Sequence, residues 1–462
     1  MASFDRRTFV AGVLGASGVL ALQPPGAALA ATDPTKCTTR PKVFKPGQDT
    51  RPVAPRRNVG VLLTDHAWMT KFQKGYAHIR AMNQNDPRSW TQQGRIHAIM
   101  CSGQPFEVHE STRFLAWHRC YLYFHERIIA WASTGGQSLD PTFRLALWNW
   151  EGNDLGVNST PSFPAAFTQG SLKDQYRQPT YSPGDGNIKA ALATPLITGT
   201  QGIYGQPYSP SSSGSALLEN ASHGQIHVDT GYQNNNPPPN PPGRDMGVLA
   251  TAGYDPVFFA HHGNIDKVWA WWQSYNPGKT PASIDPNTHQ PYDPAWAATT
   301  WQFYDYDGSC WSITAADTPN YTRNLRYTVP APPPKPTTRR VALGVAGPTL
   351  TAQSVSVPST GASVLLEDLT IPPPGRGSFG LVATVDGKPH VVGHFAVFGM
   401  EMNEPRTLSV QAQLDPQGVQ LLSKGVKLQV VPETKKALSP FAVTGANPKA
   451  AELHASSAAL LL

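Results

Sequence analysis

The sequence has few cysteines, few charges and almost no long apolar run. Four cysteines in 462 residues are too few for a disulfide framework to carry the fold. Only 15% of the residues are charged, and the formal net charge is +6. The sequence contains no block rich in lysine or arginine, so nucleic acid is not expected as a partner. A hydrophobic share of 40% excludes a disordered chain.

Proline, glycine and aromatic residues are plentiful by contrast. The 45 Pro and 40 Gly indicate long irregular connections, and the 12 Trp, 15 Tyr and 17 Phe supply large buried surfaces. A chain of this length exceeds one compact core, so we expect two or more domains.

The one apolar run lies at the N-terminus and indicates an export signal. Arg6 and Arg7 precede the run Phe9–Leu22, and Ala28-Leu29-Ala30 forms a small-x-small cleavage site. The run is shorter than the roughly 20 residues that span a bilayer, so we expect no stable membrane insertion. The arginine pair resembles the twin-arginine signal, which implies bacterial export to the periplasm or beyond. We therefore assign residues 1–30 to a signal peptide, with a buried N-terminal helix as the alternative.

Apolar residues recur at helical spacing in five stretches of the first 275 residues. Helices are predicted at Val59–Met82, Trp90–Cys101, Arg113–Trp131, Ala216–Val228 and Asp255–Gln273. Residues 152–215 are rich in Pro, Gly, Ser and Thr, and we expect a long irregular excursion there. Residues 31–329 are thus predicted to be mainly α, an antiparallel helical bundle with long irregular loops.

The composition changes abruptly at residues 330–340, where Pro330–Pro336 forms an extended linker. We place a domain boundary here. Beyond it, strands are predicted at Ala362–Leu369, Phe379–Val385, His390–Phe398, Leu408–Leu414 and Val419–Val431. Asp386-Gly387 is predicted to be a hairpin turn between two of them. Residues 341–462 are therefore expected to form a C-terminal β domain.

Six of the fourteen histidines fall into two groups of three. The groups are His97, His109 and His118, and His223, His227 and His262. His223 and His227 lie four residues apart, which places both rings on one helical face. Three imidazole nitrogens leave an open coordination position, as catalytic metal sites require. For any single histidine on an apolar helix the alternative is a hydrogen-bonded core residue, but six at these spacings favour metal binding.

Ligand type alone does not choose the metal, because neutral imidazole binds Zn, Cu, Fe and Ni. A zinc-protease motif is missing, since no Glu follows His223. Non-haem iron usually adds a carboxylate, and neither group has one. Two all-imidazole groups favour a copper pair that reacts with dioxygen. Phe114 and Phe258 each stand four residues before the last ligand of a group, where their rings can wedge the imidazoles and keep the site dry.

Several motifs, in order along the chain, resemble the type-3 copper proteins, and the plant polyphenol oxidases (catechol oxidase and tyrosinase) most closely. The motifs are Asp86–Gln93, His97–Cys101, Trp117–Leu122, His223–His227 and Asp255–Asp266, followed by Asp293–Trp296 and Phe303–Asp305. The resemblance runs from about Val59 to Val329, and the C-terminal β domain resembles the family's shielding domain more loosely. It implies two copper ions that oxidise catechols with O2 to o-quinones, with weaker ortho-hydroxylation of monophenols. Haemocyanin-like reversible O2 binding is the alternative function.

The resemblance also implies roles for individual residues. Each histidine group would bind one copper. Of the adjacent His261 and His262, the resemblance makes His262 the ligand and places His261 beside the ligands without a bond to copper. Cys101 matches the cysteine whose sulfur forms a thioether with the second ligand, here His109; a buried thiol is the alternative. Glu219 resembles the acid that orients a water near the coppers, with a solvated carboxylate as the alternative.

Two positions depart from members of the family that this chain resembles. Gly224 stands where some strong monophenol hydroxylases carry an Asn that helps to hold the water, and Leu249 aligns with the position where the plant enzymes place a Phe gate over the metal pair. Both departures favour catechol oxidation and a wider entrance.

The cysteines also differ from the plant pattern, which has two disulfides near the N-terminus. Here Cys37 stands alone, and both Cys120 and Cys310 remain open as its partner, although we expect Cys120 to be an inert thiol. In the family, a C-terminal domain covers the copper site until it is removed, and Arg339-Arg340 is a candidate cleavage point. A permanent stabilising domain is the alternative.

Overall fold

In the computed structural model, Pro34–Leu462 form one compact unit. The described residues are 33–101, 108–151, 162–177, 188–208, 216–231, 244–346, 349–351, 362–371, 377–385, 387–398, 406–423, 427–432 and 455–461. The predicted signal peptide, residues 1–30, lies outside them. A search of the described helices finds none that is both long and apolar enough to cross a membrane.

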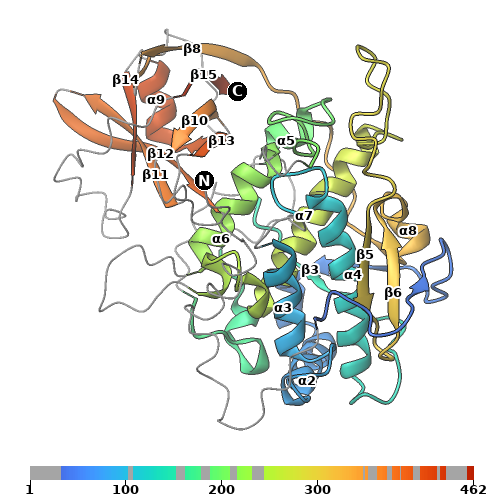
Figure 1. The fold of residues 1–462 in the computed structure, drawn as a ribbon. Helices are drawn as coiled ribbons and strands as arrows, with labels where there is room; N and C mark the ends of the chain where they lie inside the picture. Colours follow the sequence, from blue (N-terminus) through green and yellow to red (C-terminus); the bar gives the residue numbers. More distant parts are fainter. Residues whose placement is uncertain are drawn as a thin grey trace, which may run out of the picture. The chain divides into compact units, whose positions relative to one another are not determined.

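Four long helices form the core of the N-terminal two thirds of the chain (Figure 1). They are α2 (His66–Ala81), α3 (Trp90–Cys101), α4 (Phe114–Ala132) and α7 (Pro256–Tyr275). Helix α4 packs against both α2 and α7, and most of its side chains are buried. Helix α7 begins where predicted, because Asp255 accepts a hydrogen bond from the Val257 amide and proline occupies the first turn.

The helix predicted at Val59–Met82 is two elements. Val59–Leu63 form the 3₁₀ helix η2, and α2 starts only at His66. The break follows from Asp65, whose side chain accepts a hydrogen bond from the Trp68 amide at 2.9 Å and so caps a new helix.

The helix predicted at Ala216–Val228 also departs from a regular α-helix. Glu219–His223 form the π-helical turn η6, and α6 continues over Gly224–Thr230. Such π turns are frequent at functional sites. The described parts of the predicted excursion contain η4 (Ala165–Thr168), η5 (Gly170–Leu172) and α5 (Lys189–Ala193).

Short strands, which the sequence analysis did not predict, pair segments from the start of the described chain with later segments of the helical part. Strands β1 (Lys42–Val43), β6 (Cys310–Thr314) and β5 (Thr300–Tyr304) form a sheet, β2 (Ala54–Pro55) pairs with β7 (Tyr327–Thr328), and β3 (Arg57–Asn58) pairs with β4 (Ala146–Leu147). A disulfide joins Cys37 to Cys310 beside the first sheet.

Burial raises the pKa of the Cys120 thiol well above its ordinary value, which agrees with an inert thiol. The remaining short helices are η7 (Asp245–Gly247), η8 (Ala252–Tyr254), η9 (Ala315–Asp317) and α8 (Tyr321–Asn324).

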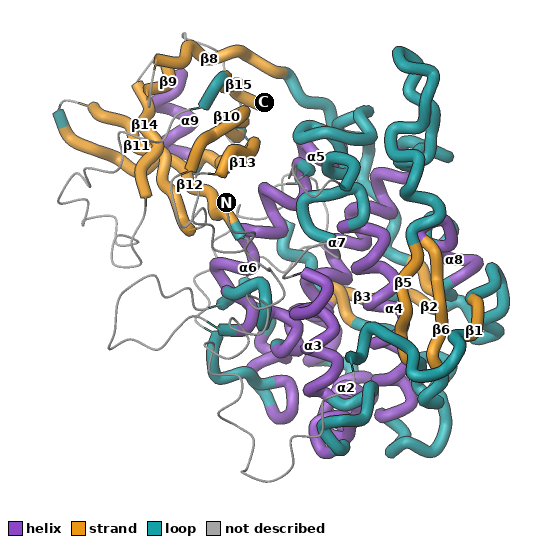
Figure 2. Tube along the Cα trace, in the orientation of Figure 1, coloured by secondary structure: helices purple, strands orange, loops and turns teal. Residues whose placement is uncertain are grey.

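The last 120 or so residues form a closed antiparallel barrel with its own apolar core (Figure 2). Its strands are β8 (Arg340–Ala346), β9 (Thr349–Thr351), β10 (Ser363–Ile371), β11 (Gly377–Val385), β12 (Lys388–Val397), β13 (Arg406–Leu414), β14 (Lys427–Pro432) and β15 (Ser457–Leu461). The barrel order is β10-β13-β12-β11-β14-β9-β8-β15. The predicted hairpin is present, with Val385 opposite Lys388 and Gly387 at φ +73°.

The strand predicted at Val419–Val431 is wrong in its first half, because α9 (Pro416–Ser423) precedes β14. The Asp415 side chain accepts a hydrogen bond from the Gly418 amide and caps the helix. Helix α9 lies very close to β12, since a Cβ at Gly418 would come within 2.2 Å of the Val392 carbonyl oxygen. Glycine at this position permits the close contact between α9 and β12. The contact is tertiary, so the sequence pattern that predicted a strand could not show it.

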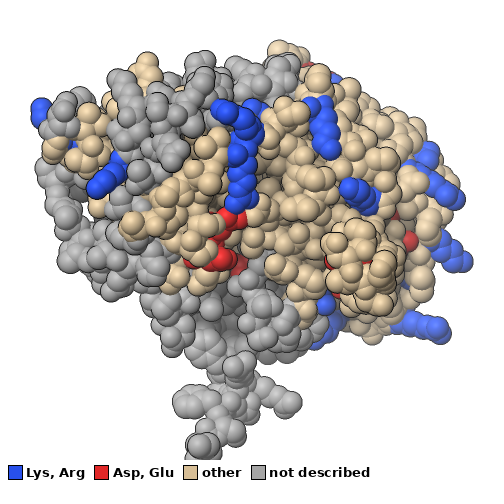
Figure 3. All heavy atoms as spheres, turned by 90° about the horizontal axis from the view of Figure 1, so that it is seen from above, with Lys and Arg blue, Asp and Glu red and all other residues tan. Residues whose placement is uncertain are grey.

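On the face shown in Figure 3, the Lys and Arg side chains are scattered over the surface and form no continuous basic patch among the described residues.

Candidate metal centre

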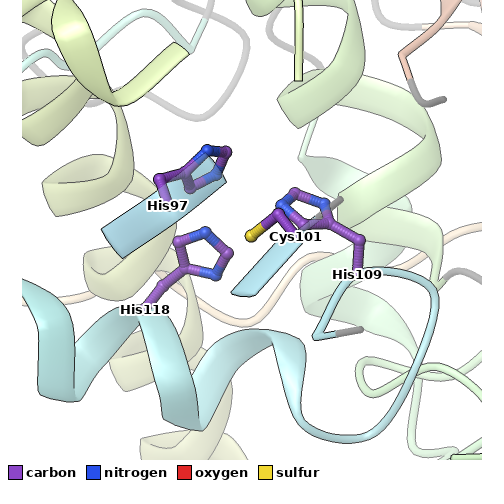
Figure 4. A group of neighbouring side chains, drawn as sticks. All are labelled: His97, Cys101, His109 and His118. Atoms are coloured by element: carbon purple, nitrogen blue, oxygen red, sulfur yellow. The ribbon is translucent and has the colours of Figure 1, made fainter. Parts of the chain in front are cut away.

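The six predicted ligands meet in two buried clusters. In the first, His97 comes from α3, His109 from the loop before α4 and His118 from the first turns of α4 (Figure 4). Their potential ligand atoms, with that of Cys101, all lie within 4.8 Å of one another. The second cluster brings together His223, His227, His261 and His262 from η6, α6 and α7 within the same distance.

The two clusters adjoin each other. The rings of His118 and His262 are stacked, with centroids 4.0 Å apart and an interplanar angle of 4°. The rings of His109 and His223 lie 5.3 Å apart. One imidazole set therefore faces the other, which is the arrangement that a two-metal centre requires.

Oxygen acceptors fix the ring orientation of four predicted ligands. The Nδ1 atom of His118 lies 2.8 Å from Phe114 O, and that of His227 lies 2.9 Å from Met246 O. The Nδ1 atom of His223 lies 3.4 Å from Glu219 O, and that of His109 lies 3.1 Å from Glu219 Oε1. Because these oxygens only accept, Nδ1 carries the hydrogen and Nε2 keeps its lone pair. Ring positioning of this kind is typical of metal-ligating histidines.

The electrostatics of the clusters also suit a metal. Burial lowers the pKa of His97 to about 3. Burial, together with repulsion from neighbouring imidazoles, lowers the pKa of His118, His223 and His262 well below the ordinary value. These rings are therefore neutral at neutral pH, which is the form that binds metal. The Nε2 atoms of His118 and His223 are buried without a hydrogen-bond partner among the described residues. The two sets fit a dinuclear copper site.

The adjacent histidines of α7 differ in what they can offer a metal. The Trp150 indole donates a hydrogen bond to His261 Nδ1 at 3.0 Å, so the neutral ring carries its hydrogen on Nε2 and has no further lone pair to give. His262 Nε2 instead lies 3.4 Å from His227 Nε2, where a shared cation fits between them. The geometry thus favours His262 as the ligand.

The two predicted phenylalanines lie among the imidazoles. The Phe258 ring is 4.7 Å from His97 and 4.3 Å from His262, and it is completely buried. The Phe114 ring lies 4.8 Å from both His118 and His223. Each ring therefore contacts imidazoles of both sets and keeps water out.

Glu219 is buried at 5% exposure, so the alternative of a solvated carboxylate is wrong. Its Oε1 lies 3.1 Å from His109 Nδ1 and accepts a hydrogen bond from the Glu110 amide at 2.7 Å. Cys101 is buried, forms no disulfide and lies beside His109 (Figure 4). Leu249 is 4% exposed and belongs to the apolar core.

Phe398 is a residue of this site that the sequence analysis did not select. Its ring is stacked on the His227 ring at 4.1 Å and 4°. Gly224 lies directly beneath it, since a Cβ there would be 3.3 Å from Phe398 Cβ. Phe398 follows β12, more than a hundred residues after the last ligand, and no local spacing relates the two.

An ion-pair network behind the ligands was also missed. Arg119, next to His118, pairs with Asp266, four residues after His262, and so joins α4 to α7. Arg56 contacts both Asp266 and Glu126 at 2.9 Å. These buried charges come from segments that are distant in sequence, so only the tertiary structure shows that they compensate one another.

Comparisons with known proteins agree with this geometry. Residues 87–200 and 197–275 match the common central domain of tyrosinase. The latent form of a chloroplastic polyphenol oxidase from Prunus armeniaca is 29% identical over 332 residues, which are 63% of this chain and 50% of that protein. The structure of latent apple tyrosinase aligns with a TM-score of 0.58 at 21% identity, covering 84% of this chain and 96% of the other.

A polyphenol oxidase structure from Grenache grapes (Vitis vinifera) aligns with a TM-score of 0.52 at 26% identity, covering 65% of this chain and 91% of that one. The core of the chain therefore has the tyrosinase fold. The chain spans about half the length of the curated relatives that it matches.

Proposed function

We propose that this chain is a member of the tyrosinase family, whose common central domain matches residues 87–200 and 197–275, and that it oxidises catechols with O2 to o-quinones at a copper pair. Weaker ortho-hydroxylation of monophenols is the expected second activity. The observation that carries the proposal is the pair of adjoining buried clusters, in which acceptor oxygens hold the histidine rings with Nε2 available for a metal.

We assign one copper to His97, His109 and His118 and the other to His223, His227 and His262. When bound, this pair would supply redox chemistry, by which electrons would pass from catechols, two from each, to dioxygen. The chain itself holds the six rings in place, and Phe114 and Phe258 exclude water from between them. Gly224 offers no side chain to hold a water beside His223, which favours catechol over monophenol as substrate.

Copper analysis combined with oxygen uptake tests this function. The copper-loaded full chain is expected to hold two copper ions and to consume O2 with catechol faster than with tyrosine. Metal content far below two, or equal rates on the two substrates, contradicts the respective part of the proposal. Haemocyanin-like oxygen carriage predicts O2 binding with little quinone, and the absorbance of the quinone product separates the two functions.

We further propose that residues 341–462 form a shielding domain and that residues 330–340 are its linker. Three contacts support this: Phe398 is stacked on His227, Gly224 lies against Phe398, and Asn220 donates a hydrogen bond to the Ser409 carbonyl at 2.6 Å. The relative from Prunus armeniaca is itself named a latent form. Arg340 begins β8 and pairs with Glu367 at 2.5 Å, so cleavage is expected before this residue. No gain of activity after cleavage in the linker argues for a permanent stabilising domain.

A thioether between Cys101 Sγ and an imidazole carbon of His109 is the third part of the proposal. The buried thiol lies in the same cluster as the ring. Forming the S–C bond removes one hydrogen from the thiol and one from the ring, and the two electrons and two protons pass to dioxygen, which becomes hydrogen peroxide. Such a crosslink would fix the orientation of the His109 ring, which is carried by a loop.

We also propose that the chain is exported by the twin-arginine route after folding. The paired Arg6 and Arg7 and the Ala28-Leu29-Ala30 site support this. Arg6→Lys with Arg7→Lys, expressed in a bacterial host with this route, should retain the protein in the cytoplasm, and unchanged export of this variant contradicts the assignment.

A further inference from the structure

We propose that Glu219 is a positioning residue that fixes the His109 ring and joins the two copper half-sites through one side chain and one carbonyl. This inference rests on the copper pair proposed above. It goes beyond the water-orienting acid that the family resemblance implies, because it gives Glu219 a direct contact with a metal ligand.

His109 is the one predicted ligand that does not lie in a helix. His97 and His118 are held by α3 and α4, and the second set by η6, α6 and α7. A ring on a loop has no helical backbone to fix its direction, and His118 obtains its own acceptor, Phe114 O, from the preceding helical turn. His109 must therefore find its acceptor elsewhere in the fold.

The Glu219 carboxylate is that acceptor. Its Oε1 lies 3.1 Å from His109 Nδ1 and 2.7 Å from the Glu110 amide nitrogen, so two successive residues of the loop are held by one oxygen. Glu110 has a left-handed backbone at φ +58°, which a non-glycine residue adopts only when its surroundings enforce it. The carboxylate thus fixes both the shape of the loop and the tautomer of the ring.

The main chain of Glu219 serves the other half-site. Its carbonyl oxygen lies 3.4 Å from His223 Nδ1, across the π-helical turn Glu219–His223. One residue therefore positions a ligand of each copper. A change in its side chain should act on the first copper, while the carbonyl contact to the second remains.

Copper binding by the full chain measures this role separately from turnover. Glu219→Ala should weaken one of the two copper equivalents by roughly 10- to 100-fold in a chelator competition, the usual cost of losing a group that orients a ligand. Glu219→Gln should stay within a few-fold of wild type, because its amide oxygen still accepts from both N–H groups. A half-filled site should also give the paramagnetic signal of a single Cu(II), which a coupled pair lacks.

Gln225→Ala is the matched control, since it removes another buried polar side chain from the same region, one bonded to Asp229 at 2.9 Å and to no predicted ligand. It should keep both coppers. If Glu219→Ala does not fold, Glu219→Met keeps the side-chain volume without an acceptor and should show the same loss of one equivalent. Wild-type affinity for both coppers in the Ala or Met variant overturns the inference, whereas a wild-type chain that binds no copper refutes the proposed function instead.

Discussion

The two histidine groups offer the same kind of donor atom to a metal but are built differently. The second group lies on helical turns, and backbone carbonyls of Glu219 and Met246 hold His223 and His227. The first group contains a loop residue, His109, which depends on the Glu219 carboxylate and lies beside Cys101. Helices fix ligands by local geometry, whereas a loop ligand needs contacts from distant parts of the chain. The Phe398 ring lies against His223 and His227 of the second group.

The largest expected effect comes from removing a ligand of the helix-built group. His262→Ala should reduce bound copper from two ions to one and abolish quinone formation, because the third imidazole of that site is lost. His261→Ala is the control, since the Trp150 indole occupies its Nδ1, and it should keep both coppers. Loss of copper from the His261 variant and not from the His262 variant would reverse the assignment.

Acid should affect both groups alike, in spite of their different construction. Burial lowers the folded-state pKa of His97 to about 3, against an ordinary value of 6.5. Between these values the unfolded chain binds a proton that the folded chain does not, so stability is present above pH 6.5 and is lost as the pH falls toward 3. For each such imidazole, the free energy of unfolding of the metal-free protein should fall by about 1.4 kcal/mol per pH unit as the pH decreases through this window. Urea unfolding of the metal-free chain at pH 7.5 and 5 measures this, and equal stability at both values contradicts it.

Uncovering the second group should raise activity moderately. Phe398→Ala removes the ring stacked on His227, a contact worth about 0.5–1.5 kcal/mol. The kcat/KM on catechol should therefore rise by roughly two- to tenfold at unchanged copper content. Phe379→Ala, which removes a ring inside the barrel that is stacked on Phe395, serves as the control for general destabilisation. A fall in activity for Phe398→Ala shows that the ring supports the site instead of blocking it.

The smallest effect is expected for the loop ligand's crosslink. Cys101→Ser should prevent the thioether, so the peptide containing residue 101 should no longer be joined to the one containing His109. Copper affinity should fall only a few-fold, because Glu219 still holds the ring. Peptide mass spectrometry of wild type should show a crosslinked pair lacking two hydrogens, and two separate unmodified peptides there would exclude the thioether. Cys120→Ser, a change at the other buried thiol, should alter neither result.

The helices that carry the ligands could be predicted because their signals are local. Asp255 caps α7 and proline occupies its first turn, and Trp90–Cys101 has the bounds expected from its apolar spacing. The π turn at Glu219–His223 could not be predicted, because a single inserted residue in so short a stretch leaves too few apolar positions to distinguish an i→i+5 turn from an i→i+4 turn. The short sheets of the helical part and α9 were missed for a related reason, since pairing partners and packing decide them.

The amino-acid sequence alone determined that His223 and His227 share one helical face and where the chain forms long helices, because i to i+4 spacing and helix caps act within a few residues. Only the tertiary structure decided the partner of Cys37, the acceptor of His109 and the aromatic ring over His227. Each of these contacts joins segments roughly a hundred residues or more apart. Their geometry depends on how the helices and the barrel pack, and no local pattern encodes that packing.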